Sequence, residues 1–563
     1  MKSWLLFAPC PAEAEDPLPG LLKTLQARMA SQAILRSSAR PSHGLNLGVI
    51  RAAPPLPELD PETADRITDL RLEALFGHMA GDDFFMRETV RLLVPMALAS
   101  SDAIRYRQET IKDGMRCTAA VLALYGAAED AVDAAYEHGI THQPGYAESV
   151  PVSVKTDNAA GLLSLLLAKS ALLGKLVRES ASEFQSDGFR DLIRQMDEGF
   201  SASFLEEAGA LLSTLSDLTR GGRLVIGASF GSGCKPQDCV LHGILPPDAR
   251  ERGGIPLHHI ALARSADEMR DAALTQVLRL VTRLSDELLR FMSRLRFELA
   301  FVVGACRLAE KVKDAGLPVC FPIPSDGAER TVFSAQQLVD AVLGLAEHAP
   351  PVPNDLAPTT ATLFLVTGAN QGGKSTFLRG IGLAQVMMQC GLFVTAASYE
   401  NRVYDAIHTH FAREEDPGMN HGRLEEELAR MDRILNRTTP HTMLLLNESF
   451  ATTTERDGAR IATGLLLALH EAGVTLFYVT HLYECAARLY ADNPPDTLFL
   501  RAERTETGVR PYRILPGEPQ ATSHARDLYG TIMAPTQGAK PAGHESPVLP
   551  DDPDRSRRRY ATA

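Results

Sequence analysis

A glycine-rich segment at residues 368–376 constrains the fold of this chain more than any other feature. It reads Gly-Ala-Asn-Gln-Gly-Gly-Lys-Ser-Thr and fits the phosphate-binding pattern Gly-x4-Gly-Lys-Ser/Thr. An apolar run of buried-strand type, 362–367, precedes it, and a segment with helical apolar spacing follows it. In a strand, glycine loop and helix start, backbone N–H groups and the helix N-terminus face phosphate oxygens. The segment therefore predicts a nucleotide site in an α/β domain.

The residues of this loop have separate expected roles. Lys374 is expected to reach the β- and γ-phosphates, and the hydroxyl of Ser375 is expected to coordinate Mg²⁺. ATP and Mg²⁺ are therefore the expected cofactors. A glycine turn without a ligand is the alternative, and it leaves the flanking strand and helix unexplained. The residues expected to bind the nucleotide are Gly368, Ala369, Asn370, Gln371, Gly372, Gly373, Lys374, Ser375 and Thr376.

Two further apolar runs, each typical of a buried strand, are followed by polar side chains. These side chains then lie at the carboxyl ends of the strands, where open α/β sheets bind their ligands. The run 442–446 is followed by Asn447 and Glu448, and the run 474–480 is followed by His481. We expect Glu448 to polarise the attacking water and His481 to sense the γ-phosphate, so both are catalytic candidates. A surface acid and a structural histidine are the alternatives. Asn447 is a candidate metal ligand without a negative charge, which predicts weaker Mg²⁺ attraction and slow turnover.

Length and charge narrow the class of protein. A chain of 563 residues is too long for one core. Its net charge of −13 means that any DNA contact must come from a local basic surface. The eight cysteines are scattered without zinc spacing, which indicates reduced thiols and a cytoplasmic protein. The N-terminal apolar stretch is short and acid-flanked, so we expect a strand there and not an export signal. No run of about 20 apolar residues is evident, and no membrane partner is expected.

Composition and periodicity divide the chain into four predicted segments. Residues 1–60 are an α/β or strand-containing N-terminal segment, and 61–345 are a mostly helical core and lever domain with a small β insertion at about 220–262. The predicted ATPase domain is 346–533, and a Pro-rich connector around 349–358 lies at its start. Residues 534–563 have the composition of a disordered tail. The predicted fold class is an α/β P-loop domain with a mainly parallel sheet, preceded by helices.

The motifs together resemble the ATPase domain of the MutS family. The loop 367–376, Asn447-Glu448, Asp457-Gly458 and Thr480-His481 carry this resemblance. It implies an ABC-type ATPase that forms a homodimer through the ATPase domain and binds DNA in repair or recombination. The segment 420–423 then matches the signature that meets the nucleotide of the other subunit, although the hydroxyl residues usual after it are absent. The short stretch before the helical core implies that the N-terminal mismatch-reading domain is missing.

Two functional hypotheses follow, and both include the ATPase. In the first, the protein is an ATP-switched DNA-binding dimer without base-specific mismatch reading. Arg279, Arg283, Arg290 and Arg294 fall on one helical face and could follow phosphates, or could instead be a solvated face paired with nearby acids. In the second, the nucleotide switch clamps a protein partner and does not bind DNA. The acidic net charge favours this alternative.

Overall fold

The computed structural model describes residues 5–6, 59–142, 150–219, 223–230, 232, 236–245, 260–326, 332–346, 351–413, 422–504 and 511–520. The helices are α2 (Pro61–Asp69), α3 (Leu72–Ala80), α4 (Phe84–Leu93), α5 (Ser101–Arg116), α6 (Thr118–His142), α7 (Val152–Glu179), α8 (Asp187–Gly199), α9 (Ala202–Thr219), α10 (Ile260–Asp314), α11 (Ala341–Ala346), α12 (Lys374–Gln389), α13 (Arg423–Leu435), α14 (Glu455–Glu471) and α15 (Tyr483–Asp492). The strands are β1 (Arg223–Phe230), β2 (Pro236–Leu245), β3 (Ile323–Ser325), β4 (Phe333–Leu338), β5 (Asn354–Thr359), β6 (Leu363–Thr367), β7 (Ser398–Arg402), β8 (Ala406–Phe411), β9 (Thr442–Asn447), β10 (Thr475–Val479), β11 (Thr497–Ala502) and β12 (Ile514–Pro516).

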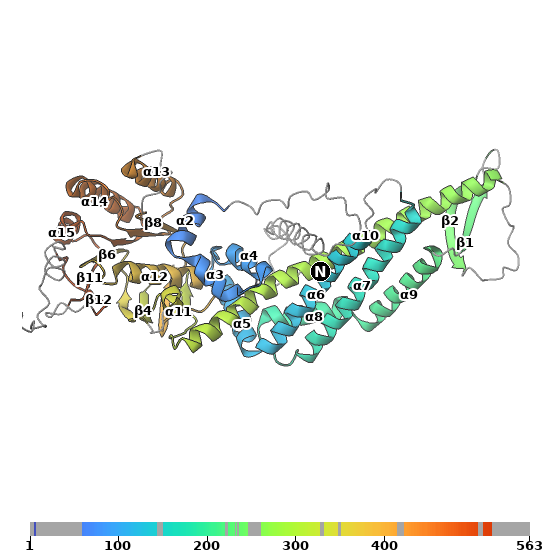
Figure 1. Cartoon of the computed structure of the whole chain (residues 1–563), viewed down its shortest axis with the longest axis horizontal. Coiled ribbons are helices and arrows are strands. Elements are labelled where there is room, and N and C mark those ends of the chain that lie inside the picture. The colour runs from blue at the N-terminus through green and yellow to red at the C-terminus, as the bar shows by residue number, and fades with distance from the viewer. Residues whose placement is uncertain are drawn as a thin grey trace, which may run out of the picture. The chain divides into compact units, whose positions relative to one another are not determined.

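Helix α10 organises the helical segment and is 55 residues long. In its second half Phe291, Leu295, Leu299 and Val302 are at most 2% exposed. Helices α3 to α7 pack against it, and Figure 1 shows α5, α6 and α7 alongside it. The long helix predicted from the apolar spacing of residues 274–302 is confirmed, and it extends beyond that range at both ends.

The arginine stripe predicted on this helix does not form one exposed face. Arg294 is buried at 6% exposure, and its Nε lies 3.3 Å from the Glu298 carboxylate. Arg283 is exposed and lies 3.4 Å from Glu287, four residues along the same helix. These contacts match the alternative of arginines paired with acids of their own helix.

Helix α7 corrects the expectation that no apolar run is long enough to cross a membrane. Its 28 residues pass that test by length and composition. Leu166, Leu173 and Val177 are buried, and the helix packs against α6, α9 and α10. Core helices of soluble proteins pass the same test, so the packing favours a core role for α7.

Strands β1 and β2 form an antiparallel pair. Arg223 lies opposite Leu245, and Phe230 lies opposite Pro236. The two strands predicted within 220–262 are confirmed, and β2 begins three residues before the predicted start at Cys239.

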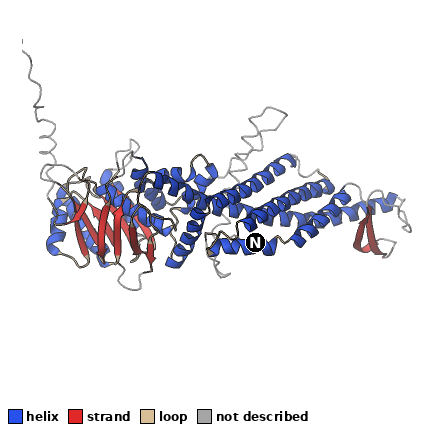
Figure 2. Cartoon of the chain, turned by 90° about the horizontal axis from the view of Figure 1, so that it is seen from below, coloured by secondary structure: helices blue, strands red, loops and turns tan. Residues whose placement is uncertain are grey.

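The glycine loop lies on a six-stranded sheet in the order β12-β11-β6-β10-β9-β8. Its strand pairs are parallel except for β11 with β12. Figure 2 shows the strands of this sheet side by side in red. All residues of β6 and β10 are buried, and the rings of Phe364 and Phe477 stack with centroids 4.1 Å apart. The prediction of a mainly parallel sheet is confirmed.

A second sheet of four strands, ordered β3-β7-β4-β5, was not predicted. Residues 354–359, expected to belong to the Pro-rich connector, form its strand β5. Pro358 is tolerated there because β5 is an edge strand and needs no N–H for a second neighbour. The predicted domain boundary at residue 346 falls in sequence between β4 and β5, two neighbours in this sheet, and the boundary itself stays a prediction.

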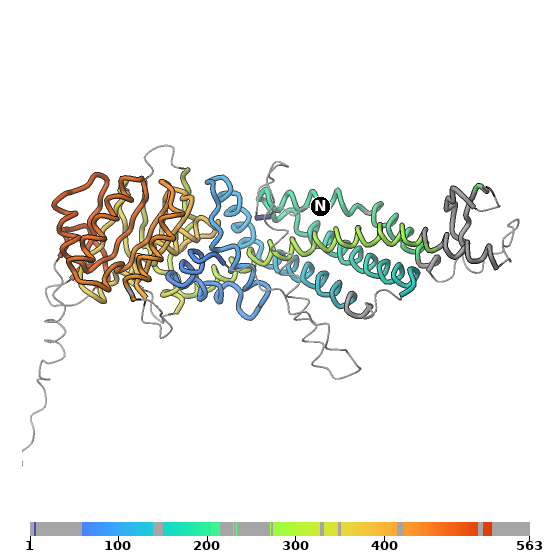
Figure 3. The backbone as a smooth tube through the Cα atoms, turned by 90° about the horizontal axis from the view of Figure 1, so that it is seen from above, coloured from blue at the N-terminus to red at the C-terminus, as the bar shows by residue number. Residues whose placement is uncertain are grey.

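Helix α2 packs on strand β8, and Figure 3 shows the blue α2–α4 segment beside the sheet region. Arg430 of α13 makes the central contact. Its Nε donates to Asp65 at 2.7 Å, and another of its nitrogens donates to Asp69. It also donates to the backbone carbonyls of Phe411, at 3.0 Å, and Thr409, at 3.1 Å. One buried guanidinium therefore joins α2, β8 and α13.

We expect the substitution Arg430→Met to lower the free energy of unfolding by about 3–5 kcal/mol, because it leaves Asp69 buried without its cation and takes from Asp65 one of its arginine partners, Arg413 being another. Arg433→Met is the matched control, since the Arg433 side chain is 47% exposed and 3.9 Å from Asp65. It should cost less than about 1 kcal/mol. Chemical denaturation of both variants measures the free energy of unfolding. Equal decreases in the two variants would contradict the conclusion that Arg430 joins α2, β8 and α13.

The predicted N-terminal segment and tail lie largely outside the described residues. Leu5 and Leu6 are described and are at most 1% exposed. The N–H of Leu5 donates to Glu298 of α10 at 3.0 Å, and Arg107 of α5 donates to the carbonyl of Leu6 at 3.0 Å. These two residues are thus anchored in the helical core.

Candidate nucleotide site

The glycine loop connects β6 to α12, as predicted. Gly368 has a φ of 117° and Gly373 has a φ of 91°, values that side chains rarely allow. A Cβ on Gly368 would also lie 2.9 Å from the backbone nitrogen of Ala502. Helix α12 then begins at Lys374, so its N-terminus faces the loop. The local backbone explains why glycine stands at these two positions.

Lys374 is buried within the loop, at 4% exposure. Its ammonium donates to the carbonyls of Gly368, at 2.7 Å, and Ala369, at 3.2 Å, and to the side chain of Asn370 at 3.4 Å. Burial lowers the pKa of Lys374, and the charge of Glu448 partly offsets this. The loop therefore holds a cation at its centre.

The end of β9 faces the start of α12. The hydroxyl of Ser375 donates to the side-chain oxygen of Asn447 at 2.9 Å. Together these residues border a cavity of about 320 Å³. Its lining residues are Asn370, Gln371, Gly372, Gly373, Lys374, Ser375, Thr376, Ala412, Asn447 and Glu448. Of these only Ala412, which follows β8, was not predicted.

Glu448 and His481 lie side by side at the ends of β9 and β10. Nδ1 of His481 is 3.5 Å from the Glu448 carboxylate, and the two side chains are 36% and 30% exposed. The hydrogen bond to Glu448 raises the pKa of His481, and burial opposes this. Glu448 has a φ of 56°, and its N–H donates to the carbonyl of Val479 at 2.8 Å. The structure thus brings the predicted base and sensor together, while their roles stay predictions.

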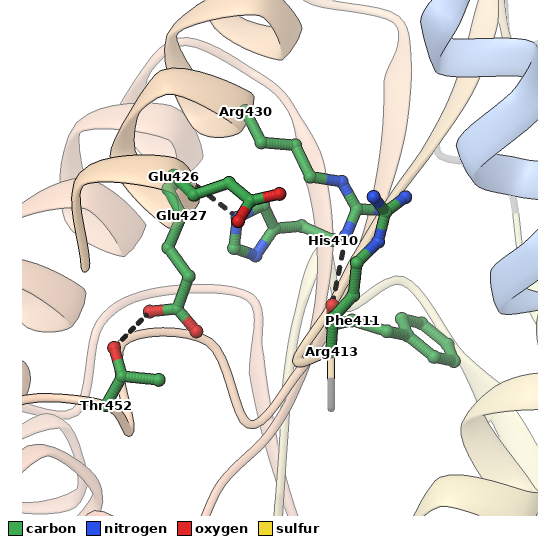
Figure 4. A pocket seen from close by; sticks show the side chains of 7 residues that line it. All are labelled: His410, Phe411, Arg413, Glu426, Glu427, Arg430 and Thr452. Carbon is green, nitrogen blue, oxygen red and sulfur yellow. Dashed lines mark hydrogen bonds between the residues drawn. The ribbon is translucent and has the colours of Figure 1, made fainter. Parts of the chain in front are cut away.

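The predicted signature segment is described only in part. Asn420 and His421 lie outside the described residues, whereas Gly422 precedes α13 and Arg423 begins it. His410 on β8 was not predicted from the sequence. Its Nε2 lies 3.1 Å from the carbonyl of Glu427 on α13 (Figure 4). No periodicity or motif singles out a histidine within a buried strand such as β8.

Comparison with known proteins places this geometry in a family. The model of MutS domain V matches residues 364–521, which contain the loop, both further strand ends and His481. The model of the MutS2 N-terminal domain matches residues 99–315, from before α5 to the end of α10. The chain belongs to the MutS family. In this MutS chain the domain V match covers the parallel sheet, and MutS domain V is a P-loop ATPase domain.

Individual relatives resemble part of this MutS chain. The DNA mismatch repair protein MutS of Thermus thermophilus is 32% identical over 221 residues, which is 36% of this chain and 27% of the relative. The DNA mismatch repair protein MutS 2 of Halobacterium salinarum is 32% identical over 192 residues, which is 33% of this chain and 21% of the relative. The DNA mismatch repair protein MutS of Streptococcus equi is 31% identical over 150 residues, which is 26% of this chain and 17% of the relative. The matches thus span at most about a quarter of each relative's length.

Proposed function

We propose that this MutS chain binds and hydrolyses ATP with Mg²⁺. The convergence of the glycine loop, Ala412 and the pair Asn447 and Glu448 around one cavity carries the proposal, because these parts come from three separate segments of the chain. Membership of a family whose domain V is a P-loop ATPase domain supports it. In this proposal the loop binds the phosphates, and the ends of β9 and β10 supply the chemistry.

The donor set fits a nucleotide with a divalent cation. Lys374 would exchange its bonds to Gly368 and Ala369 for bonds to phosphate oxygens, which are charged and therefore stronger acceptors. Ser375 and Asn447 offer two neutral oxygens to the metal, directly or through water. The metal would neutralise charge on the phosphates. The absence of a carboxylate at 447 motivates the proposed slow turnover.

In this site Glu448 would accept a proton from, or orient, the attacking water. His481 would stay hydrogen-bonded to Glu448 and face the terminal phosphate. Its raised pKa favours a positive charge on His481, which attracts the anionic phosphate. Both side chains are partly exposed, so water can reach them.

The substitution Asn447→Asp should strengthen metal binding. A carboxylate beside Ser375 adds a negative charge, so we expect half-maximal hydrolysis at about fivefold to tenfold lower Mg²⁺, equivalent to about 1 kcal/mol. A Mg²⁺ titration of ATP hydrolysis measures this. Asn436→Asp on the exposed end of α13 is the control and should leave the titration unchanged. An identical titration for Asn447→Asp would remove Asn447 from the metal site.

We also propose a homodimer through the ATPase domain. The cavity is lined by the loop, by Ala412 and by the end of β9, whereas Gly422 and α13 do not line it. A second copy is the proposed source of contacts with the exposed side of a bound nucleotide. The oligomeric state measured by light scattering, with and without ATP, tests this, and a monomer in every nucleotide state would oppose it.

We further propose that the dimer is cytoplasmic and binds DNA in repair or recombination. Relatives named DNA mismatch repair proteins support this role. With a net charge of −13, DNA contact must be local, so affinity should fall steeply as salt rises. Fluorescence anisotropy with homoduplex, mismatched and branched DNA, across salt and nucleotide states, is the test. No binding at low salt in any nucleotide state would reject the DNA role and leave the ATPase proposal standing.

A further inference from the structure

The turn after β9 is held in an unusual conformation. Glu448 and Phe450 both have positive φ, 56° and 64°. Backbone of this kind persists where its surroundings hold it. The N–H of Glu448 donates to Val479 at 2.8 Å, and the hydroxyl of Tyr478 donates to the carbonyl of Ser449 at 3.1 Å. The direction of the Glu448 side chain therefore depends on contacts made by its neighbours.

His410 contacts this turn from strand β8. The residue is 1% exposed, and its ring stacks on Phe450 with centroids 5.8 Å apart. Its Nδ1 lies 2.7 Å from the hydroxyl oxygen of Ser449, and its Nε2 lies 3.1 Å from the carbonyl oxygen of Glu427 on α13. Figure 4 shows the imidazole between β8 and that helix. One ring thus bridges the turn and α13.

The partners of His410 determine which ring nitrogen carries the proton. The carbonyl of Glu427 only accepts, so Nε2 is the donor. Burial, with the charge of Arg430, lowers the pKa of His410 to about 4, so the ring keeps one proton at neutral pH. Nδ1 then carries a lone pair that accepts from the hydroxyl of Ser449, whose single proton is shared with the backbone carbonyl of His410, 2.9 Å from the same hydroxyl oxygen. A neutral imidazole protonated on Nε2 is therefore compatible with both side-chain contacts.

Two residues of α13, Glu427 and Arg430, make further hydrogen bonds near His410. The hydroxyl of Thr452 donates to the carboxylate of Glu427 at 3.0 Å. Arg430, one turn further along α13, donates to the carbonyls of Thr409 and Phe411, the two neighbours of His410 on β8. The bridge therefore connects the turn to a helix whose place against the sheet is already determined.

We propose that His410 is a positioning residue for ATP hydrolysis. By joining Ser449 to Glu427 it holds the turn against α13 and aims the carboxylate of Glu448. Since α13 begins next to Gly422, the same bridge connects the proposed base to the helix that carries the predicted cross-subunit segment. This inference rests on the proposed role of Glu448.

The test compares steady-state ATP hydrolysis with equilibrium ATP binding in the full chain. His410→Phe keeps a ring against Phe450 and removes both nitrogen contacts. We expect its kcat to fall about 10-fold to 100-fold while the Kd for ATP stays within about twofold. His408→Phe is the matched control, because His408 is also buried, on the same face of β8, at 5% exposure. Its kcat should stay at the wild-type value.

Conservative and double variants separate positioning from folding. His410→Asn offers an amide oxygen near the Nδ1 position and should recover part of the kcat lost in His410→Phe. Adding Ser449→Ala to His410→Phe should cause a smaller loss than Ser449→Ala causes alone, because among the described residues the one contact of the Ser449 hydroxyl left in His410→Phe is with the backbone carbonyl of residue 410, at 2.9 Å. If His410→Phe does not fold, Ser449→Ala alone should lower kcat without changing the Kd for ATP.

Two outcomes would overturn the inference. One is a wild-type kcat in His410→Phe, or in Ser449→Ala where that is the variant tested. The other is a loss confined to ATP binding. A wild-type chain that neither binds nor hydrolyses ATP would instead reject the proposed function, so the wild-type measurement distinguishes the two failures.

Discussion

Lys374→Ala is expected to raise the Kd for ATP about 100-fold, equivalent to about 3 kcal/mol, and to abolish measurable hydrolysis. Lys374 holds the only side-chain cation among the residues that line the described cavity. Its three present contacts are neutral oxygens, so the ammonium is available for charged phosphate oxygens. Isothermal titration with ATP and a hydrolysis assay measure both effects.

The matched control is Lys175→Ala on α7, where the lysine is 68% exposed and its nearest acid, Glu179, is 3.8 Å away. It should bind ATP as the wild type does. Circular dichroism should show both variants folded, because the substitution at 374 removes a buried charge and leaves no acid unpaired. Normal ATP binding and hydrolysis by Lys374→Ala would refute the assignment of residues 368–376 as the phosphate site.

Glu448→Gln should lower kcat about 10²-fold to 10⁴-fold and leave ATP binding nearly unchanged. The amide has the shape of the carboxylate but cannot take a proton, and Glu448 lines the cavity without being part of the loop. Single-turnover hydrolysis with saturating ATP isolates this step. Glu471→Gln at the exposed end of α14 is the control and should hydrolyse ATP at the wild-type rate.

The same substitution should lower the pKa of His481. The hydrogen bond to the Glu448 carboxylate is the main cause that raises this pKa, and glutamine removes the charge. The wild-type histidine should therefore stay protonated to a higher pH than the histidine of the variant. An NMR titration of the imidazole measures the difference, and equal pKa values would show that the two side chains do not interact in solution.

Local sequence was sufficient for the nucleotide loop and for the strand ends around it. The spacing of glycines, Lys374 and Ser375 is set by backbone geometry within ten residues, so it can be recognised without the rest of the fold. Asn447, Glu448 and His481 were found by one further rule, that ligands gather at the carboxyl ends of parallel strands. The helical periodicity of residues 274–302 likewise predicted α10.

Long-range contacts explain what the sequence did not reveal. Strand β5 contains Pro358 and its residue types do not alternate between apolar and polar, and it forms by pairing with β4. Arg294 shares a helical face with exposed arginines, and it is buried because the bundle covers that part of α10. Neither outcome can be derived from residue types along a single segment.

The sequence by itself determined that this MutS chain has a glycine loop of the phosphate-binding pattern and which strand ends accompany it, because those signals are local and periodic. Only the tertiary structure decided that α2 is joined to α13 through Arg430, Asp65 and Asp69, and that His410 bridges the turn after β9 to the same helix. The physical reason is separation along the chain. Arg430 and Asp65 are 365 residues apart in the sequence. A hydrogen bond between residues so far apart along the chain leaves no recognisable sequence pattern near either of them.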